Sequence, residues 1–241
     1  PIADVAPVSV TGLNPRVAQL AEQIRHLQRR TDALRIPSGL AALDAALGGG
    51  FVTAAIHELV ATSDGVAAHT LAWRVAAQAA GRQKWILYLD PQADLYPPAL
   101  AQLGVPLGRL LVARTARAAD ALWICEQALH CRALAAVVLP LRSIDALASR
   151  RLQLAAETGR SLGLLIRTND GSRRSTAGQS GASSSGAGAT FAATRLRLEP
   201  RPGDMNRRRM RITVLKLREG RPAEPFVVEV PDPGESERSE V

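Results

Sequence analysis

The stretch AIHELVATSDGVAAHTLAWRVAAQAAGRQKWILYLD, residues 55–90, decides the fold class. It opens with an apolar segment (55–60), passes through an alanine-rich segment of helical character (66–80) that Gly81 ends, and returns to an apolar segment (85–89). Short apolar strands joined by a helix are typical of a parallel sheet, because its strands are buried on both faces. We therefore predict a strand, a helix and a second strand here.

The same alternation continues along the chain. Ser143 is predicted to cap one later helix, and Ser38 to cap a short helix that Gly48–Gly50 ends. Beyond residue 190 polar and apolar residues alternate, as in antiparallel strands with one solvated face. The further predicted elements are helices at 97–104, 118–131 and 143–158 and strands at 110–113, 135–139, 162–166, 190–198, 210–217 and 225–230.

Together these elements predict an α/β fold with a mostly parallel sheet sandwiched by helices and a C-terminal antiparallel extension. The predicted core covers residues 35–230. Within it, residues 169–189 are rich in Ser, Gly and Ala, so we predict a flexible loop that buries no core of its own. Residues 231–241 are predicted to be a disordered acidic tail.

An N-terminal arm with an amphipathic helix is predicted over residues 1–34. Asn14 and Pro15 are typical of an N-cap followed by the first helical residue. The apolar residues of this helix form one stripe, which favours equally a surface for a partner protein and a helix packed on its own core. The stripe consists of Val17, Leu20, Ile24 and Leu27.

Basic residues are concentrated between residues 195 and 218, in a chain whose net charge is +8. Such a stretch can meet phosphates or an acidic partner, or it can be a solvated face. Two arginines also open the predicted loop, although no aromatic residue for base stacking follows before Phe191. The candidate nucleic-acid contacts are Arg173, Arg174, Arg207, Arg208 and Arg209.

Several classes of protein fit the sequence poorly. No apolar run reaches the length that a bilayer requires and no signal peptide is recognised, so we expect a cytoplasmic protein. Cys125 and Cys131 are expected on different faces of one helix, which suits neither a disulfide nor a metal pair. We therefore expect no metal and no cofactor.

Three segments give the chain a resemblance to the RecA family. IPSGLAALDAALGGG (36–50) resembles the segment that leads into the RecA core, and Glu58-Leu59-Val60 stands where RecA has the strand that feeds its phosphate loop. YLDPQADLYP (88–97) resembles the strand and turn that bear the RecA catalytic glutamate. The resemblance covers residues 36–230 and implies a RecA-like P-loop NTPase-type core. Small degenerate members called ImuA, sometimes labelled SulA-like, resemble this chain best.

The residues that the resemblance would require for ATP hydrolysis are absent. A phosphate loop needs glycines, a lysine and a Ser or Thr, whereas residues 61–70 offer only Gly65 and Thr70. Gln92 stands in place of the catalytic glutamate and Leu139 in place of the magnesium-ordering acid. Asp90 is interpreted as a turn-stabilising carboxylate. We therefore predict that the protein has no catalytic residues and is not an ATPase.

The resemblance to ImuA implies a function in DNA-damage-induced (SOS) translesion synthesis. It predicts a non-catalytic accessory protein that contacts an inactive Y-family-like protein, an error-prone replicative-type polymerase or RecA. Two alternatives stay open: a RecA paralogue that binds single-stranded DNA, and an SOS inhibitor of cell division.

Overall fold

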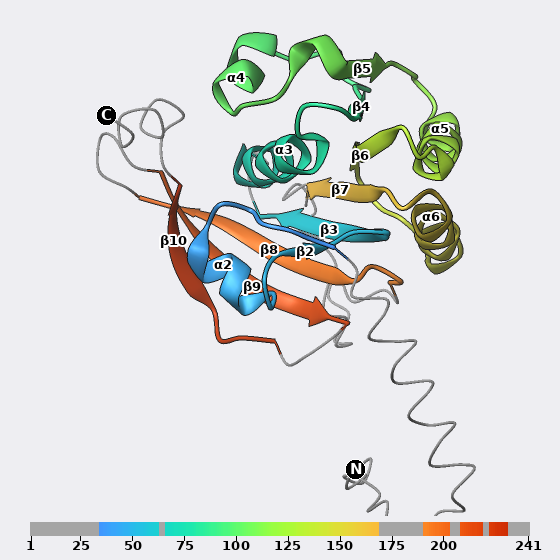
Figure 1. Ribbon diagram of the computed structural model, residues 1–241. Helices are drawn as coiled ribbons and strands as arrows, with labels where there is room; N and C mark the ends of the chain where they lie inside the picture. The colour runs from blue at the N-terminus through green and yellow to red at the C-terminus, as the bar shows by residue number, and fades with distance from the viewer. Residues whose placement is uncertain (1–33, 63–65, 169–189, 203–207, 219–221, 231–241) are drawn as a thin grey trace, which may run out of the picture. The chain divides into compact units, whose positions relative to one another are not determined.

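The computed structural model describes residues 34–62, 66–168, 190–202, 208–218 and 222–230. The chain divides into two units, Pro1–Leu34 and Arg35–Val241, and the second is described here. Within the described residues, an eight-stranded sheet has the strand order β10-β9-β8-β3-β7-β6-β4-β5 (Figure 1). The strands from β8 to β5 pair in parallel, whereas β9 and β10 are each antiparallel to their neighbours. The predicted fold class is therefore confirmed.

The strands of this sheet are β3 (Ala55–Ala61), β4 (Trp85–Leu89), β5 (Leu110–Ala113), β6 (Leu134–Leu141), β7 (Leu162–Thr168), β8 (Thr194–Arg201), β9 (Arg208–Leu217) and β10 (Phe226–Val230). The helices are α2 (Ala41–Ala46), α3 (Val66–Ala80), α4 (Pro97–Gln102), the 3-10 turn η1 (Leu107–Arg109), α5 (Ala118–His130) and α6 (Ala146–Gly159). A two-stranded ribbon, which the sequence did not predict, pairs β1 (Arg35–Ile36) with β2 (Phe51–Val52).

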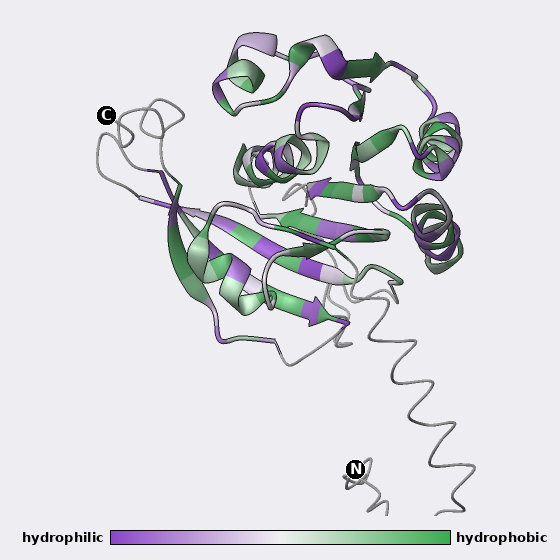
Figure 2. Cartoon of the chain, viewed as in Figure 1, coloured by the Kyte–Doolittle hydropathy of each residue, from purple (hydrophilic) through white to green (hydrophobic). Residues whose placement is uncertain are grey.

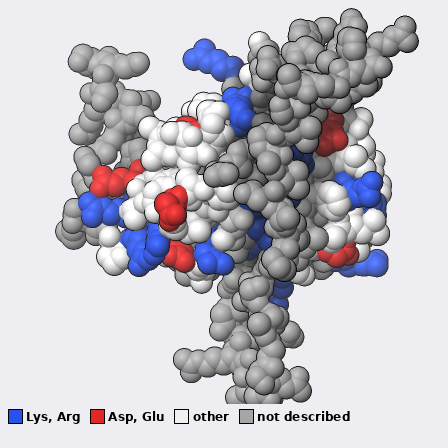
Figure 3. Space-filling view, turned by 90° about the horizontal axis from the view of Figure 1, so that it is seen from below, with Lys and Arg blue, Asp and Glu red and all other residues white. Residues whose placement is uncertain are grey.

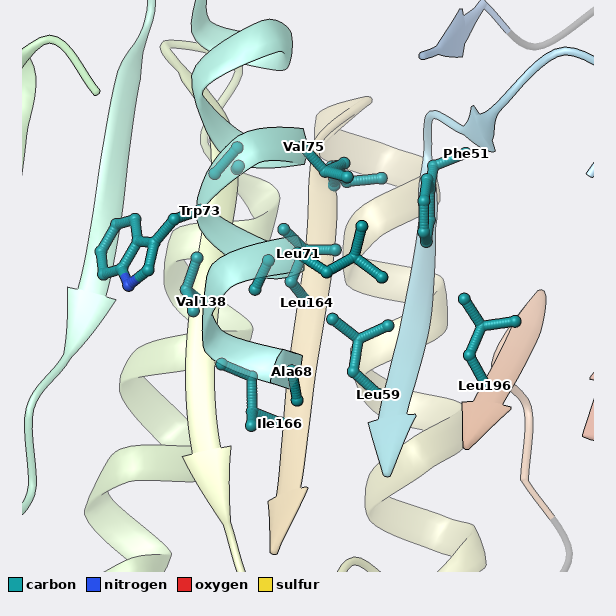
Figure 4. Close-up of a cluster of buried hydrophobic side chains, with 14 of the residues drawn as sticks. Phe51, Leu59, Ala68, Leu71, Trp73, Val75, Val138, Leu164, Ile166 and Leu196 are labelled. Atoms are coloured by element: carbon teal, nitrogen blue, oxygen red, sulfur yellow. The ribbon is translucent and has the colours of Figure 1, made fainter. Parts of the chain in front are cut away.

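Apolar side chains pack on both faces of the sheet, as parallel strands require. On one face α2 and α3 meet β3, β7, β8 and β9, and Leu71, Val75 and Leu164 lie in the middle of this cluster (Figure 4). On the other face α5 and α6 meet the opposite sides of β3, β4, β6 and β7 through residues such as Leu129 and Leu152. The carboxyl ends of the parallel strands thereby lie along one edge of a sheet that is packed on both faces.

Two helix starts differ from the prediction. Helix α6 begins at Ala146 and its N-cap is Asp145, whose carboxylate accepts a hydrogen bond of 2.7 Å from the Ala148 amide. Ser143 is therefore not the cap, because a carboxylate three residues before a free amide already satisfies it. Helix α2 likewise begins at Ala41, without a side-chain cap.

Ser38 has a different function from the predicted one. Its amide and hydroxyl both donate to the Asp44 carboxylate, at 2.7 and 2.8 Å, and its Oγ accepts from the Leu40 amide at 3.1 Å. Ser38 thus fastens the segment before α2 to the middle of that helix. The sequence places an N-cap type of residue correctly near the helix but two residues too early.

The antiparallel extension joins the parallel sheet through β8, which pairs in parallel with β3. Along β8 and β9 hydrophobic and hydrophilic residues alternate, which Figure 2 shows as green and purple bands. Leu196, Leu198 and Ile212 face the cluster that α2 and α3 cover. The side chains between them consequently lie on the opposite face of the extension.

Candidate functional site

The connection from β3 to α3 occupies the place of a phosphate loop. In the motif G-x-x-x-x-G-K-[ST], the first glycine ends a strand and the G-K-[ST] triplet opens the following helix. Strand β3 ends at Ala61 and α3 begins at Val66, so residues 62–65 correspond to the four variable positions of the motif. The motif positions are then Ala61, Val66, Ala67 and Ala68.

Each of these positions carries a hydrocarbon side chain. Ala67 has no ammonium group to approach phosphate oxygens, and Ala68 has no hydroxyl for magnesium and is fully buried against the core. Thr70 lies one turn further along α3 and is half-buried, while Gly65 lies outside the described residues. Counted in this way, the motif positions do not include Gly65 and Thr70, which the sequence suggested as residues of a degenerate loop; that suggestion stays a prediction.

The neighbouring strand ends carry few polar groups. Leu139 on β6 is buried in the cluster beneath α5 and α6, so it belongs to the core. Gln92 is exposed in the turn after β4. Asp90, at the end of β4, is buried, and its carboxylate accepts hydrogen bonds of 3.2 Å from the Asp94 amide and from Arg114 Nε. This geometry agrees with the interpretation of Asp90 as a turn-stabilising carboxylate.

A buried ionic cluster lies in the middle of the sheet. Glu58 on β3 is fully buried, and its Oε2 lies 2.9 Å from Arg195 Nε on β8 and 3.3 Å from an Arg167 amino nitrogen on β7. Thr190 donates a hydrogen bond to Glu58, and Lys216 on β9 donates to the Thr190 carbonyl. The Glu58 carboxylate therefore links β3 with β7 and β8, and also with Thr190 in the segment before β8.

The same cluster also reaches α6. Ser149 of α6 is buried, lies 3.3 Å from the Thr190 hydroxyl and accepts a hydrogen bond of 3.0 Å from the Phe191 amide. Burial, and then the nearby charges of Arg218 and Arg195, lower the pKa of Lys216, whereas Glu58 raises it. Positive charge thus exceeds negative charge around Glu58.

On the opposite face of β3, His57 makes a second polar link to β8. Its Nδ1 lies 2.8 Å from the Thr194 hydroxyl, its Nε2 lies 2.9 Å from the Val52 carbonyl, and its ring meets Phe51 edge-on. Burial, the largest cause, lowers the pKa of His57 to about 4. A neutral imidazole held in this way is a structural group rather than a general base.

The structure describes only part of the predicted nucleic-acid and partner sites. Arg208 and Arg209 open β9, where Arg208 is exposed and Arg209 contacts the Glu229 carboxylate at 2.7 and 2.9 Å. The other predicted contacts lie outside the described residues. These are Arg173, Arg174 and Arg207 of the nucleic-acid set and Val17, Leu20, Ile24 and Leu27 of the apolar stripe.

The cysteines are separated as the sequence predicted. Cys125 is buried and burial raises the pKa of its thiol to about 12, whereas Cys131 is exposed. Among the residues that the structure covers, no group of three or more His, Cys, Asp and Glu side chains comes together as metal ligands would. None of the helices described here combines the length and apolarity of a membrane crossing.

Comparisons with known proteins agree with the α/β fold described above. Residues 20–170 match the family of RecA N-terminal domains. The chain belongs to this family. Its RecA-like fold is also that of a RadB recombinase crystal structure, with a TM-score of 0.59, 16% sequence identity, and coverage of 80% of this chain and 94% of the other.

Curated relatives refine this assignment. Protein ImuA from two strains of Caulobacter vibrioides, NA1000 / CB15N and ATCC 19089, is 30% identical over 144 residues, which are 57% of this chain and 57% of ImuA. The cell division inhibitor SulA of Edwardsiella piscicida is 32% identical over 90 residues, which are 37% of this chain and 54% of SulA. The chain therefore spans little more than half of the length of these relatives. It is an ImuA-like, RecA-like protein.

The ionic cluster was not predicted, although the sequence carries a visible signal of it. Glu58 is a carboxylate in the middle of a strand whose other residues are almost all apolar, and a buried carboxylate requires a cationic partner. Arg195 lies on the face of β8 that the alternation of Leu196 and Leu198 turns away from the core. The sequence could not show that this face lies beside Glu58, because that depends on the parallel pairing of β3 with β8.

Proposed function

We propose that this chain is a non-hydrolytic RecA-like accessory protein of DNA-damage-induced translesion synthesis and mutagenesis. The observation that carries the proposal is the β3–α3 connection, which keeps the spacing of a phosphate loop but has Ala61, Val66, Ala67 and Ala68 at its four defining positions. Phosphoryl transfer depends on a lysine, a magnesium ion and a residue that positions the nucleophile. Leu139 and Gln92 add to this loss, and the similarity to ImuA supplies the biological context.

Phosphate release from ATP by the purified chain tests the loss of catalysis. We expect release at the rate of the buffer blank, with and without magnesium, since no charged group of the connection can stabilise the transferred phosphoryl group. Saturable turnover that disappears in Thr70→Ala or Asp90→Asn would overturn this part of the proposal. Turnover that survives both substitutions, and varies between preparations, indicates a contaminating ATPase and leaves the expected inactivity intact.

The accessory function consists of contacts with polymerase-like proteins. The resemblance to ImuA supports an inactive Y-family-like protein and an error-prone replicative-type polymerase as partners, with RecA as a third candidate. Co-purification of the tagged full chain with each candidate from DNA-damaged cells tests these contacts, and a chain lacking residues 1–33 tests the apolar stripe. If the full chain captures none of the three candidate partners, the accessory function is overturned. If the full chain and the chain lacking residues 1–33 capture them equally, the apolar stripe takes no part in these contacts.

The SulA similarity favours a second candidate function, inhibition of cell division. Its 90 matched residues are 54% of SulA. Overexpression in growing cells distinguishes the two functions, because an inhibitor of division produces filaments even without a mutagenic polymerase. Cells of normal length, with damage-induced mutation restored by the chain, support the accessory function.

A further inference from the structure

Helices α5 and α6 carry large apolar side chains on the surface that faces away from the sheet. Their inward residues, such as Leu129 and Leu152, belong to the core beneath them. On the outward side, Trp123 of α5 is 59% exposed, and Leu147 and Leu154 of α6 are 69% and 52% exposed. Single exposed leucines are common, whereas tryptophan is on average highly buried, because it has a large apolar area. These three outward side chains are called the apolar patch.

The members of the apolar patch lie on one surface. Leu147 and Leu154 are two turns apart, so they lie on one side of α6, about 10.5 Å apart along its axis. Between them, Arg151 donates a hydrogen bond of 3.2 Å to Glu126 of α5. Trp123 lies one turn before Glu126. This ion pair joins α5 and α6 side by side, with Trp123 over one helix and the leucines over the other (Figure 1).

The acidic residues of α5, of α6 and of the α6 N-cap all have partners among the described residues. Asp120 lies 4.0 Å from Arg117, Glu126 contacts Arg151, Asp145 accepts from the Ala148 amide, and Glu157 accepts from Gln153 and lies 3.8 Å from Arg218. Acidic and basic side chains lie beside one another on the face that Figure 3 shows, in keeping with such pairing. The carboxylates of the two helices therefore leave little negative charge beside the apolar patch.

Arg150 adds a positive charge to the apolar patch. It is exposed, and it neighbours Leu147 and Leu154 on α6, three residues after the first and four before the second. Its guanidinium group lies over the Phe191 ring, 5.7 Å from the centroid, and no carboxylate of the described residues pairs with it. Phe191 is itself 40% exposed. The uncompensated charge within the patch is therefore positive.

We propose that the apolar patch binds an amphipathic helix of a partner protein, with acidic residues beside the apolar stripe of that helix. A docked helix presents anchors at i, i+3, i+4 and i+7, a spacing that matches Leu147 and Leu154. Its carboxylates pair with Arg150. Tryptophan and arginine are enriched among the residues that dominate binding energy. This surface of the core is separate from residues 1–33, and the inference rests on the proposed accessory function only for the biological identity of the partner.

Two occupants from the same chain are less favoured, because their charge does not complement that of the patch. Residues 14–30 contain four arginines and one acidic residue, Glu22, so this segment and Arg150 repel each other. A second copy that docks by the same surface brings two Arg150 side chains into one interface. The favoured occupant is therefore a different protein.

Fluorescence anisotropy of a labelled synthetic peptide tests the proposal on the full chain. The probe is a helix of about 18 residues, or five turns, with leucines at i, i+3 and i+7 and glutamates beside them. We expect saturable binding, weaker by about tenfold or more in Leu147→Ala/Leu154→Ala, which removes two anchors. Arg150→Glu should weaken binding by about threefold to tenfold, because like charges then meet.

The emission of Trp123 reports whether the probe covers the patch. Trp73 is buried and Trp85 is half-buried, so Trp123 is the most exposed of the three tryptophans. Its emission should move to shorter wavelength as the probe binds. In Trp123→Phe this shift should disappear, while most of the affinity remains because the ring is still apolar.

Matched controls change similar side chains elsewhere. Leu107→Ala/Leu215→Ala removes leucines on η1 and β9 that are 40% and 39% exposed, and Arg82→Glu reverses an exposed charge before β4. Both should bind the probe like the unsubstituted chain, with equal urea midpoints for all variants. Absence of saturable binding by the unsubstituted chain overturns the proposal, as do equal losses in test and control variants.

Three other outcomes assign the patch differently and also overturn the proposal. The first is equally tight binding of a probe with lysines in place of the glutamates. The second is a dimer, measured by sedimentation, that Leu147→Ala/Leu154→Ala abolishes, since the occupant is then a second copy. The third is probe binding that appears only when residues 1–33 are deleted. Co-purification with polymerase-like proteins is measured separately, so its failure leaves a positive peptide result intact.

Discussion

Strand β3 carries its ionisable residues in its middle and none at its carboxyl end. In mid-strand, Glu58 joins β8 through Arg195 on one face, and His57 joins the same strand through Thr194 on the other. At the end, where a phosphate loop would need a glycine followed by charge, Ala61 leads towards the apolar first turn of α3. The ionisable groups of β3 therefore lie where they connect strands and not at its carboxyl end. The β3–β8 junction therefore carries buried ionisable groups, whereas Ala61, Thr62 and Val66, the described residues at the β3–α3 connection, carry none.

The largest expected effect that sharpens this comparison comes from Glu58→Gln. The substitution leaves Arg195 and Arg167 as buried charges without their carboxylate. Removal of one partner of a buried ion pair costs about 3–5 kcal/mol, so we expect the free energy of unfolding to fall by that amount. Urea denaturation followed by circular dichroism measures it.

A surface pair provides the control for this substitution. Glu199→Gln breaks the contact between Glu199, whose side chain is 30% exposed, and Arg201, whose side chain is 45% exposed. This loss should cost less than about 1 kcal/mol. Equal losses of unfolding free energy for Glu58→Gln and Glu199→Gln would show that the buried cluster stabilises the junction no more than a surface ion pair does. The contrast between the two regions of β3 would then disappear.

The second expected effect is the pH dependence that His57 confers. Its pKa is about 4 in the folded chain against 6.5 for an unperturbed histidine, so the unfolded chain binds the proton more readily. Stability is therefore fully present above pH 6.5 and is lost as the pH falls towards 4. Between pH 7.5 and 4.5 this loss amounts to about 2–3 kcal/mol, at about 1.4 kcal/mol per pKa unit.

The variant His57→Gln isolates the contribution of this one group. An amide side chain retains a donor and an acceptor for Val52 and Thr194 but does not titrate. The difference in unfolding free energy between the unsubstituted chain and His57→Gln should change by about 2–3 kcal/mol across that pH range. Parallel pH profiles for the two proteins would mean that the histidine is protonated at no cost, and hence that the junction is open to water.

The sequence predicted the strands and helices where local pattern decides them. Helix 66–80 and the strands at 85–89 and 110–113 were predicted with the bounds that the structure has, because apolar runs and Gly81 define them locally. The start of α6 was wrong by three residues, since Ser143 and Asp145 are both good N-cap residues and only the backbone geometry selects one.

Contacts that depend on strand order were beyond the reach of the sequence. Glu58 and Arg195 are far apart in the chain and become neighbours only because β8 returns beside β3. The antiparallel pairing of β8 with β9 likewise places Arg197 and Arg211 on one face, with Glu199 of β8 opposite Arg211. The resemblance predicted which chemical groups are missing, and the spacing of the phosphate-loop motif falls on Ala61, Val66, Ala67 and Ala68 only when it is counted from the observed ends of β3 and α3.

The smallest expected effect concerns Asp90, which among the described residues is the one buried acid directly after a strand of the parallel sheet. Asp90→Asn weakens the hydrogen bonds that its carboxylate accepts from the Asp94 amide and from Arg114, and should lower the free energy of unfolding by about 1–2 kcal/mol. Arg114 is 63% exposed, so Arg114→Ala should cost less than about 1 kcal/mol. If Asp90→Asn instead leaves stability unchanged, the carboxylate does not hold the turn, and the contrast between a polar junction and an apolar edge loses its simplest explanation. A loss of stability that exceeds that of Arg114→Ala shows that the Asp90 carboxylate stabilises the turn chiefly through the Asp94 amide, as a polar group that holds the backbone.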